Sequence, residues 1–510
     1  MRSWDTSHWL AILAITNVAI HLAFYNNLGY HRDELLYFSL GQHPAFGYAS
    51  VPPLIGWLSA AISGLLGYSV FTARLIPALF SGFMVLLVAS MTRELGGKPY
   101  ARILAAIAIM CAPFTLRTFF LYQPVFLDVT FWTLLFYFTL RYLNTEDGLY
   151  LMLMGILSGL AMLNKYLIGL LILALLLSLL VTRYRTAFQK KEMYWGLALA
   201  LLIFLPNLIW QFLHDLPLVT HLQELNETQL VNVSYANFLS DQLMMPFAAT
   251  LLTIPGLIYL LVRPQNVKYR ALGIAALLVV ISLLLLRGKS YYTIGVFPVL
   301  IAAGAAFYEQ IIQPKYLRWA LPVLLVILTI PILPIGLPIY KPAGLISYFD
   351  HLEKEYGLDL GRRFEDGTIR SLPQDYADML GWESIATIAR QAHETIPEGE
   401  QGIIYGENYG QAGAVSIIGE QWNLPYPLSF SDSFRYWLPD SIPLEVKHLI
   451  YINDELGSDV GSAFSQIKII GKVSNPHARE YGTTVYLCSY PRESVNSLWQ
   501  QARARVNSVE

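Results

Sequence analysis

The feature that most constrains this chain is a series of apolar runs, each about as long as a membrane-spanning helix. A helix that crosses a bilayer needs roughly 20 mostly apolar residues. The chain is 55% hydrophobic and 14% charged, against about 25% charged in a soluble domain. We therefore predict a polytopic α-helical membrane protein with about 11 spans. The runs lie at roughly 8–26, 70–92, 101–118, 123–141, 149–164, 166–182, 193–212, 243–262, 270–287, 290–309 and 317–338.

Two further features bear on the spans. The apolar stretch at 51–67 is short and opens with two prolines. We expect it to form an interfacial or re-entrant helix, with a further span as the alternative. The first residues, MRSWDTSHW, run into the first apolar run without a small-residue cleavage site. This predicts that the first helix is retained.

The lysine and arginine content of alternate loops predicts the orientation. Cytoplasmic loops carry an excess of these two residues. The richer set consists of the N-terminus and five loops, at 92–102, 141–148, 183–191, 263–270 and 310–318. It contains 14 lysines and arginines, whereas the alternate set contains 5. We expect the richer set in the cytoplasm of a cell with this protein in its plasma (inner) membrane, and the C-terminal region outside.

The composition becomes mixed and polar from about residue 340. The segment 373–392 has the apolar period of a helix. Four short segments are predicted strands, at 402–406, 448–454, 467–473 and 483–490. We divide the chain into a transmembrane domain at 1–339 and an extracytoplasmic α/β domain at 340–510. The net charge of −2 and the absence of a basic tail in the sequence predict no nucleic-acid partner.

The few charged residues on the predicted outer side gather near the membrane boundary. Ionisable residues at the membrane are costly and are therefore functional candidates. The acids are Asp33, Glu34 and Asp128, and the cations are Arg74, Arg117, Lys165, Arg287 and Lys289. We interpret Arg117 as a headgroup contact.

This combination of charges suits transfer from a lipid-phosphate donor. Lysine and arginine are the usual partners of phosphate, and a carboxylate can act as general base on an acceptor hydroxyl or amine. Structural roles are the alternatives. Asp33 and Glu34 would then be the acidic start of a helix. Arg74 would be an interfacial anchor and Lys165 a loop charge.

Several ordered motifs resemble one family of membrane enzymes. The stretch HRDELLYFSLGQHPAFGYASVPPLIGWL, from His31, resembles the first outer loop of polyprenol-phosphate-sugar glycosyltransferases with a GT-C fold. This group includes the protein O-mannosyltransferases (glycosyltransferase family 39) and the aminoarabinose transferase of lipid A. The shared features are an acidic pair, a Gly-Tyr and a Pro-Pro. The segments ARLIPALFSG, FLDVTFW and GKSYYTIGVFPVLIAAGAA resemble later family segments.

The resemblance implies a role for each matching residue. Asp33 is the expected base or acceptor-orienting acid, with Glu34 beside it, and Asp128 is its expected partner near the sugar. Arg74 and Lys289 are expected donor-phosphate ligands, with Lys165 as a further candidate. Arg287 is also a candidate phosphate ligand, on its charge and its place in the turn beside Lys289. The implied reaction inverts the anomeric carbon by displacing polyprenyl phosphate.

One departure bears on the substrate. Lipid A-type members carry Lys-Pro where this chain has Val51-Pro52-Pro53, which argues against lipid A or aminoarabinose as substrate. His31 and His43 would need further ligands to hold a metal, and we expect no metal and no cofactor. Glu407 and Asn408 are candidates for acceptor selection, with loop turn chemistry as the alternative.

The expected partners are a polyprenyl-phosphate sugar donor, membrane lipid, and an acceptor lipid, glycan or protein. A transporter or flippase for a lipid-linked sugar is the rival hypothesis from another class. Transporters usually have two related halves, and no such halves are visible in the sequence. A ligase acting on lipid-linked oligosaccharides is the third hypothesis.

Overall fold

The computed structural model describes residues 6–228, 230–364 and 367–509 and forms two compact units. The helical unit contains the described residues up to Tyr25, Val51–Ile55 and Ala73–Tyr340. The α/β unit contains Asn26–Ser50, Gly56–Thr72 and the chain from Lys341 onward. It therefore combines the C-terminal region with two segments that precede it by about 270 residues or more in the sequence. The expected division at 339/340 did not include these segments.

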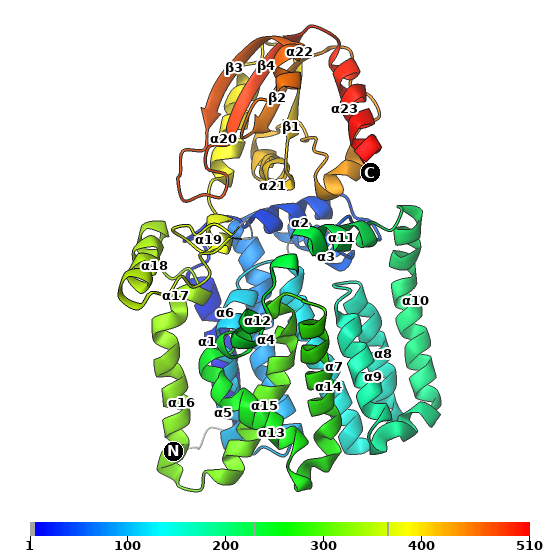
Figure 1. Cartoon of the computed structure of the whole chain (residues 1–510), viewed down its shortest axis with the longest axis vertical. Coiled ribbons are helices and arrows are strands. Elements are labelled where there is room, and N and C mark those ends of the chain that lie inside the picture. Colours follow the sequence, from blue (N-terminus) through cyan, green and yellow to red (C-terminus); the bar gives the residue numbers. More distant parts are fainter. Residues whose placement is uncertain (1–5, 229, 365–366, 510) are drawn as a thin grey trace. The chain divides into compact units, whose positions relative to one another are not determined.

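The helical unit consists of α-helices joined by short 3₁₀ segments and turns (Figure 1). Its α-helices are α1 (Thr6–Ala23), α4 (Val70–Glu94, from Ala73), α5 (Pro99–Met110), α6 (Pro113–Thr118), α7 (Pro124–Thr145), α8 (Gly148–Met162), α9 (Ile168–Leu180), α10 (Lys191–Leu213), α11 (Pro217–Thr228), α12 (Tyr235–Met244), α13 (Thr250–Leu261), α14 (Arg270–Leu285), α15 (Phe297–Ile311), α16 (Lys315–Thr329) and α17 (Leu333–Gly336). The 3₁₀ helices are η1 (Arg183–Gln189), η2 (Leu230–Asn232), η3 (Phe247–Ala249), η4 (Pro264–Tyr269), η5 (Ser290–Val296) and η6 (Ile330–Ile332).

Within the described residues, 6 helices are long and apolar enough to cross a membrane, or up to 8 if each of two bent helix pairs is one span. The bent pairs are α9 with η1, and α12 with the segment Phe247–Leu261. The other three predicted spans coincide with α5 and α6, with α7 and with α8. Residues 1–5, including the Arg2 of the charge count, lie outside the described residues.

Prolines shorten two of the expected elements. The run predicted at 101–118 is divided, because α5 ends at Met110 and α6 begins at Pro113. Proline has no backbone N–H and cannot continue a helix without losing a hydrogen bond. The stretch after Pro52-Pro53 forms α3 (Leu54–Leu66), a 13-residue helix. It is shorter than the roughly 20 residues of an ordinary span, and its interfacial or re-entrant placement stays a prediction.

The α/β unit is built on one mixed sheet of four strands in the order β1-β2-β4-β3. The strands are β1 (Gln401–Gly406), β2 (Val446–Asn453), β3 (Phe464–Lys472) and β4 (Thr484–Pro491). β1 and β2 are parallel, and the other two pairs are antiparallel. All four predicted strands are confirmed. The unit's α-helices are α2 (Arg32–Gln42), most of α3, α18 (Pro342–Tyr356), α19 (Gln374–Ala377), α20 (Trp382–Glu394), α21 (Tyr409–Gly413), α22 (Ser458–Ala463) and α23 (Val495–Val509).

The prediction of one helix over 373–392 is wrong, because the segment forms α19 and α20 with a break between them. Gly381 interrupts it with a φ of 96°, a backbone conformation that glycine adopts without the steric cost of a Cβ atom. α20 packs on the sheet against β2, β3 and β4 (Figure 1). The break lets α20 begin a new direction and present its buried alanines and Ile385 to the strands.

Glycines set the close approach of α8 and α10 in the helical unit. A Cβ atom placed on Gly155 of α8 would lie 2.1 Å from the carbonyl oxygen of Gly196 on α10. One placed on Gly196 would lie 2.7 Å from the carbonyl oxygen of Leu151. Small residues allow helix backbones to approach closely in membranes, where packing rather than water exclusion drives association.

We predict that Gly155→Ala destabilises the protein by about 1–3 kcal/mol, because a methyl group here overpacks the helix pair. The measurement is the midpoint of thermal unfolding of purified protein in detergent. Gly169→Ala in α9 is the matched control, since the nearest neighbouring atom would be the Met162 sulfur at 3.9 Å. Equal unfolding midpoints for the two variants would contradict the close α8–α10 contact.

Candidate functional site

The acidic pair of the α/β unit lies at the first turn of α2, where Glu34 has a structural partner. His31 is the N-cap residue, and its Nδ1 accepts a hydrogen bond from the Asp33 backbone N–H at 3.1 Å. The Glu34 carboxylate accepts a hydrogen bond from the His31 backbone N–H at 2.8 Å. This reciprocal arrangement is a capping box. Glu34 is 0% exposed, so its carboxylate serves the helix start.

Asp33, next to Glu34, has a different environment. Its side chain is 30% exposed, and its carboxylate accepts a hydrogen bond of 2.9 Å from the Tyr409 hydroxyl. Arg32 lies over the ring of Tyr409, with its guanidinium carbon 4.2 Å from the ring centroid. Burial and the Asp33 charge raise the pKa of Tyr409 well above its usual value. The phenol therefore stays protonated and holds the Asp33 carboxylate in one orientation.

Acids from the C-terminal region surround the His31 ring. Nε2 of His31 lies 3.8 Å from an Asp375 carboxylate oxygen and 3.9 Å from one of Asp378. Arg479 forms an ion pair with Asp378 at 3.2 Å. Burial raises the pKa of Asp378, and the charges of His31 and Arg479 oppose that shift. The sequence analysis did not find these residues, because they are more than 300 positions from α2 and no local spacing joins them to it.

In the helical unit, three predicted residues are brought together. Asp128 on α7 is 6% exposed and accepts a 3.0 Å hydrogen bond from the Trp132 indole N–H, one turn later. Lys165, in the turn between α8 and α9, interacts electrostatically with Asp128 and with Lys289. The neighbouring Asn164 side chain donates to the carbonyl of Pro124 at the start of α7, which ties this turn to α7.

Two tyrosines of η5 complete this cluster. The Lys165 ammonium lies 5.4 Å from the Tyr291 ring centroid and 5.1 Å from that of Tyr292. The Lys289 ammonium lies 6.0 Å from the Tyr291 centroid. These distances are in the range of cation–π attraction. The structure thus places both tyrosines beside Lys165, and Tyr291 also near Lys289.

Two other predicted cations, Arg74 and Arg287, have different partners. Arg74 is 1% exposed, and its guanidinium carbon lies 4.6 Å from the Phe120 ring centroid. A side chain so enclosed by protein is not a surface anchor. Arg287 donates to the Tyr235 hydroxyl at 3.3 Å, in the first turn of α12. The two arginines are thus held by aromatic residues other than those beside Lys165.

Glu407 and Asn408 in the α/β unit also have defined contacts. The Asn408 side chain accepts hydrogen bonds from the backbone N–H groups of Gly410 and Gln411 and caps α21. This supports turn chemistry for Asn408. Glu407 is exposed and accepts a 3.3 Å hydrogen bond from the Tyr451 hydroxyl. Across the described chain, no group of three or more His, Cys, Asp and Glu side chains is placed to hold a metal ion.

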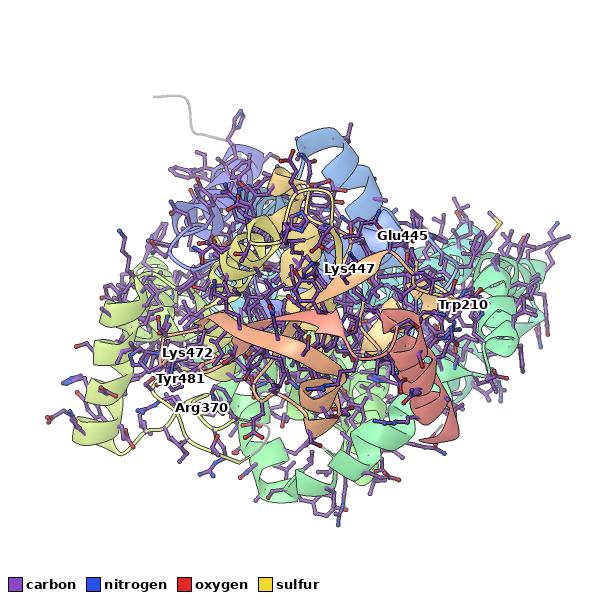
Figure 2. The ribbon with its side chains drawn as sticks, turned by 90° about the horizontal axis from the view of Figure 1, so that it is seen from above. Trp210, Arg370, Glu445, Lys447, Lys472 and Tyr481 are labelled. Carbon is purple, nitrogen blue, oxygen red and sulfur yellow. The ribbon has the colours of Figure 1, made fainter. Side chains whose placement is uncertain are left out.

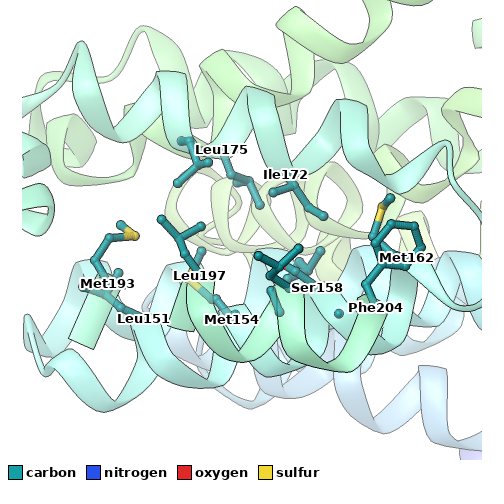
Figure 3. Close-up of a pocket in the computed structure, with 15 residues that line it drawn as sticks. Leu151, Met154, Ser158, Met162, Ile172, Leu175, Met193, Leu197 and Phe204 are labelled. Atoms are coloured by element: carbon teal, nitrogen blue, oxygen red, sulfur yellow. The ribbon is translucent and has the colours of Figure 1, made fainter. Parts of the chain in front are cut away.

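The helical unit also contains an apolar pocket of about 250 Å³. It lies among α7, α8, α9 and α10, and Met, Leu and Phe side chains surround it with Ser158 as the single hydroxyl (Figure 3). Such a lining suits a hydrocarbon chain rather than a charged group, because an unpaired charge in apolar surroundings is costly.

Sequence comparisons relate the chain to glycosyltransferases. Residues 50–210 match the family described as dolichyl-phosphate-mannose-protein mannosyltransferase. The lipid A galacturonosyltransferase RgtD of Rhizobium johnstonii is 27% identical over 218 residues, which is 42% of this chain and 46% of that protein. The match thus spans about half the length of this curated relative.

Solved structures resemble the chain over most of its length. ArnT of Cupriavidus metallidurans, crystallised with undecaprenyl phosphate, matches with a TM-score of 0.63 and 14% sequence identity. The match covers 95% of this chain and 98% of the ArnT chain. The Archaeoglobus fulgidus oligosaccharyltransferase matches with a TM-score of 0.51 and 13% sequence identity, over 87% of this chain and 67% of the oligosaccharyltransferase chain. The mycobacterial arabinofuranosyltransferase AftD matches with a TM-score of 0.51 and 13% sequence identity, over 96% of this chain and 40% of the AftD chain.

These matches confirm the resemblance found in the sequence. The chain has the fold of the GT-C glycosyltransferases and is related to them. Together with its apolar helices, the fold identifies a multi-pass membrane protein with a small C-terminal sheet domain.

The capping box generates a prediction for Glu34. Glu34→Ala leaves the buried His31 N–H without its acceptor, so we expect a loss of about 1–3 kcal/mol in unfolding free energy. Glu34→Gln keeps a side-chain acceptor and should unfold close to the wild type. Thermal unfolding of the two purified variants tests this. A larger loss for the Gln variant than for the Ala variant would contradict the capping role.

Proposed function

We propose that this protein is an inverting glycosyltransferase that moves a sugar from a polyprenyl-phosphate donor to an acceptor on the outer face of the plasma (inner) membrane. The observation that carries the proposal is the cluster of Asp128, Lys165 and Lys289 beside two tyrosines in a protein with the GT-C fold. The undecaprenyl phosphate bound by the ArnT neighbour supports a donor of this kind.

The proposed reaction is a direct displacement at the anomeric carbon. An acceptor oxygen forms the new bond to this carbon, and the bond from the carbon to the phosphate oxygen breaks. The electron pair leaves with polyprenyl phosphate, and the configuration inverts because attack comes from the opposite face. The acceptor proton passes to Asp33 as general base. Its partial exposure and the hydrogen bond from Tyr409 support this role.

The leaving phosphate needs electrostatic stabilisation more than a proton. We assign this role to Lys165 and Lys289, with Arg74 as a further ligand, because cations placed where negative charge develops lower the barrier. Asp128 makes the enclosed Lys165 ammonium tolerable by supplying an opposite charge. We place it near the sugar. Arg287 is a weaker candidate, since Tyr235 already accepts a hydrogen bond from its guanidinium.

The acceptor is a lipid, a glycan or a protein. The absence of the Lys-Pro pair at Val51-Pro52-Pro53 argues against the substrate of the aminoarabinose transferases. The lysine and arginine distribution supports a placement of the α/β unit outside the cell. With the site on the outer side, the donor is a lipid-linked sugar that has already been moved to the outer leaflet.

We predict that Asp33→Asn lowers transfer by about a hundredfold or more, because it removes the general base. The assay is transfer of radiolabelled sugar from a panel of polyprenyl-phosphate monosaccharides by detergent-purified protein. Glu383→Gln is the matched control, since Glu383 is an exposed carboxylate of the same unit. Full transfer by a folded Asp33→Asn protein would refute the base assignment.

The same assay separates the rival functions. A wild-type protein that binds the lipid but turns over no donor would favour a transporter or flippase. Turnover of diphosphate donors alone would favour a ligase.

We predict that Lys165→Gln raises the KM for the donor and lowers kcat/KM by about tenfold to a hundredfold, because a charge-assisted phosphate contact is lost. Lys191→Gln is the control, since Lys191 is exposed at the start of α10. Steady-state kinetics at varied donor concentration measure both constants. An unchanged KM and kcat for Lys165→Gln would exclude Lys165 as a phosphate ligand.

A further inference from the structure

The α/β unit contains a cleft that the proposed chemistry does not use. Its volume is about 720 Å³, within the roughly 300–1,000 Å³ of small-molecule sites. The cleft lies on one face of the sheet, between strands β1 and β2 and the helices α22 and α23. α20 packs on the opposite face, where Ile404 and Ile450 point. The cleft is therefore separated from α20 by the sheet itself.

Aromatic rings form the floor of the cleft. Tyr405 on β1 is the register partner of Tyr451 on β2, and their rings are stacked at 5.8 Å with an interplanar angle of 6°. Trp499 of α23 stacks on Phe430 at 5.3 Å, and Phe430 lies 6.0 Å from Tyr405. All four line the cleft. The floor is thus lined by aromatic side chains from two strands, a loop and the C-terminal helix. Tyr405 and Phe430 are half-buried, whereas Tyr451 and Trp499 are 7% and 6% exposed and belong to the core beneath.

Charged side chains line the rim. Glu407, Asp459, Arg492, Glu493 and Arg505 are all exposed and all border the cleft. Arg505 pairs with Asp459 at 3.1 Å. Glu407 accepts the hydrogen bond from Tyr451. Three acids against two arginines leave the rim slightly negative.

This lining selects for one chemical class of ligand. Aromatic faces bind the apolar C–H faces of a sugar ring, and carboxylates and guanidinium groups bind its hydroxyls through charge-assisted hydrogen bonds. A phosphate or other strong anion is disfavoured by the excess of acids, and a purely apolar ligand would desolvate the charged rim without supplying hydrogen bonds to it. We propose that the cleft is a binding site for an oligosaccharide, the glycan part of the acceptor.

The identity of the ligand as an acceptor rests on the proposed function, but saccharide binding itself does not. A second site that holds the glycan away from the reacting hydroxyl supplies binding energy without taking part in chemistry. Its loss is expected to raise the KM for a glycan acceptor while leaving kcat nearly unchanged.

The test uses the full-length protein in detergent and an array of soluble trisaccharides of hexose, deoxyhexose, aminohexose and hexuronate units. The binding of each trisaccharide to the protein is then measured by isothermal titration calorimetry. We expect at least one trisaccharide to bind, and Glu407→Gln and Arg492→Ala each to weaken binding by about tenfold, since each removes a charge-assisted hydrogen bond. Both side chains are exposed, so neither substitution should unfold the unit, which thermal unfolding checks.

Glu445→Gln is the matched control, because Glu445 is exposed just before β2, is labelled in Figure 2, and does not line the cleft. It should bind like the wild type. Binding of no trisaccharide, or binding that survives both cleft substitutions, would overturn the proposal.

Transfer assays on the same variants separate the two proposals. Saccharide binding that depends on Glu407 and Arg492, in a protein that transfers no sugar, would retain the cleft site and reject the enzyme. Sugar transfer with an acceptor KM unchanged by both substitutions, and no saccharide binding, would retain the enzyme and reject the cleft site.

Discussion

The constraint on which the helical unit depends is the absence of water in the hydrocarbon core, where every backbone N–H and C=O must find a partner within the protein. Long helices satisfy this requirement along their length. Breaks in helices expose unpaired backbone groups and are tolerated only where protein encloses them. The turn between α8 and α9 joins two predicted spans, and there the Asn164 side chain donates a hydrogen bond to the carbonyl of Pro124 at the start of α7. Lys165, the candidate phosphate ligand, follows directly.

A second consequence concerns the charges. A charged group enclosed by apolar side chains needs an opposite charge or hydrogen bonds to balance its lost hydration. Asp128 has the Trp132 indole and the Lys165 charge, and Lys165 has the two tyrosine rings. The same interactions that make these groups tolerable in the membrane unit place two cations and one carboxylate together. The contacts of Asp128 and Lys165 therefore both stabilise these charges and form the proposed phosphate site.

In the α/β unit, the acidic start of α2 is completed by residues far away in the chain. The Arg32 backbone N–H donates to the carbonyl of Asp378 at 2.9 Å, and Tyr409 holds Asp33. Two adjacent acids thereby acquire different environments, since Glu34 closes the capping box while Asp33 keeps a partly exposed carboxylate. The Glu34 partner is local, since His31 lies three residues before it, whereas the Asp33 partner Tyr409 lies 376 positions later and cannot be identified from the Asp-Glu pair alone.

The sequence by itself determined the membrane class, the four strands, the apolar helices and the short list of charged residues, because apolar periodicity and the cost of membrane charges are local properties. It did not determine the break at Gly381, the assignment of residues 26–50 to the α/β unit, or the distinct partners of Arg287 and Lys289. Those outcomes depend on which side chains meet when distant segments pack. Only the tertiary structure brings Tyr291 to Lys165, Tyr409 to Asp33, and α23 to the aromatic face of the sheet.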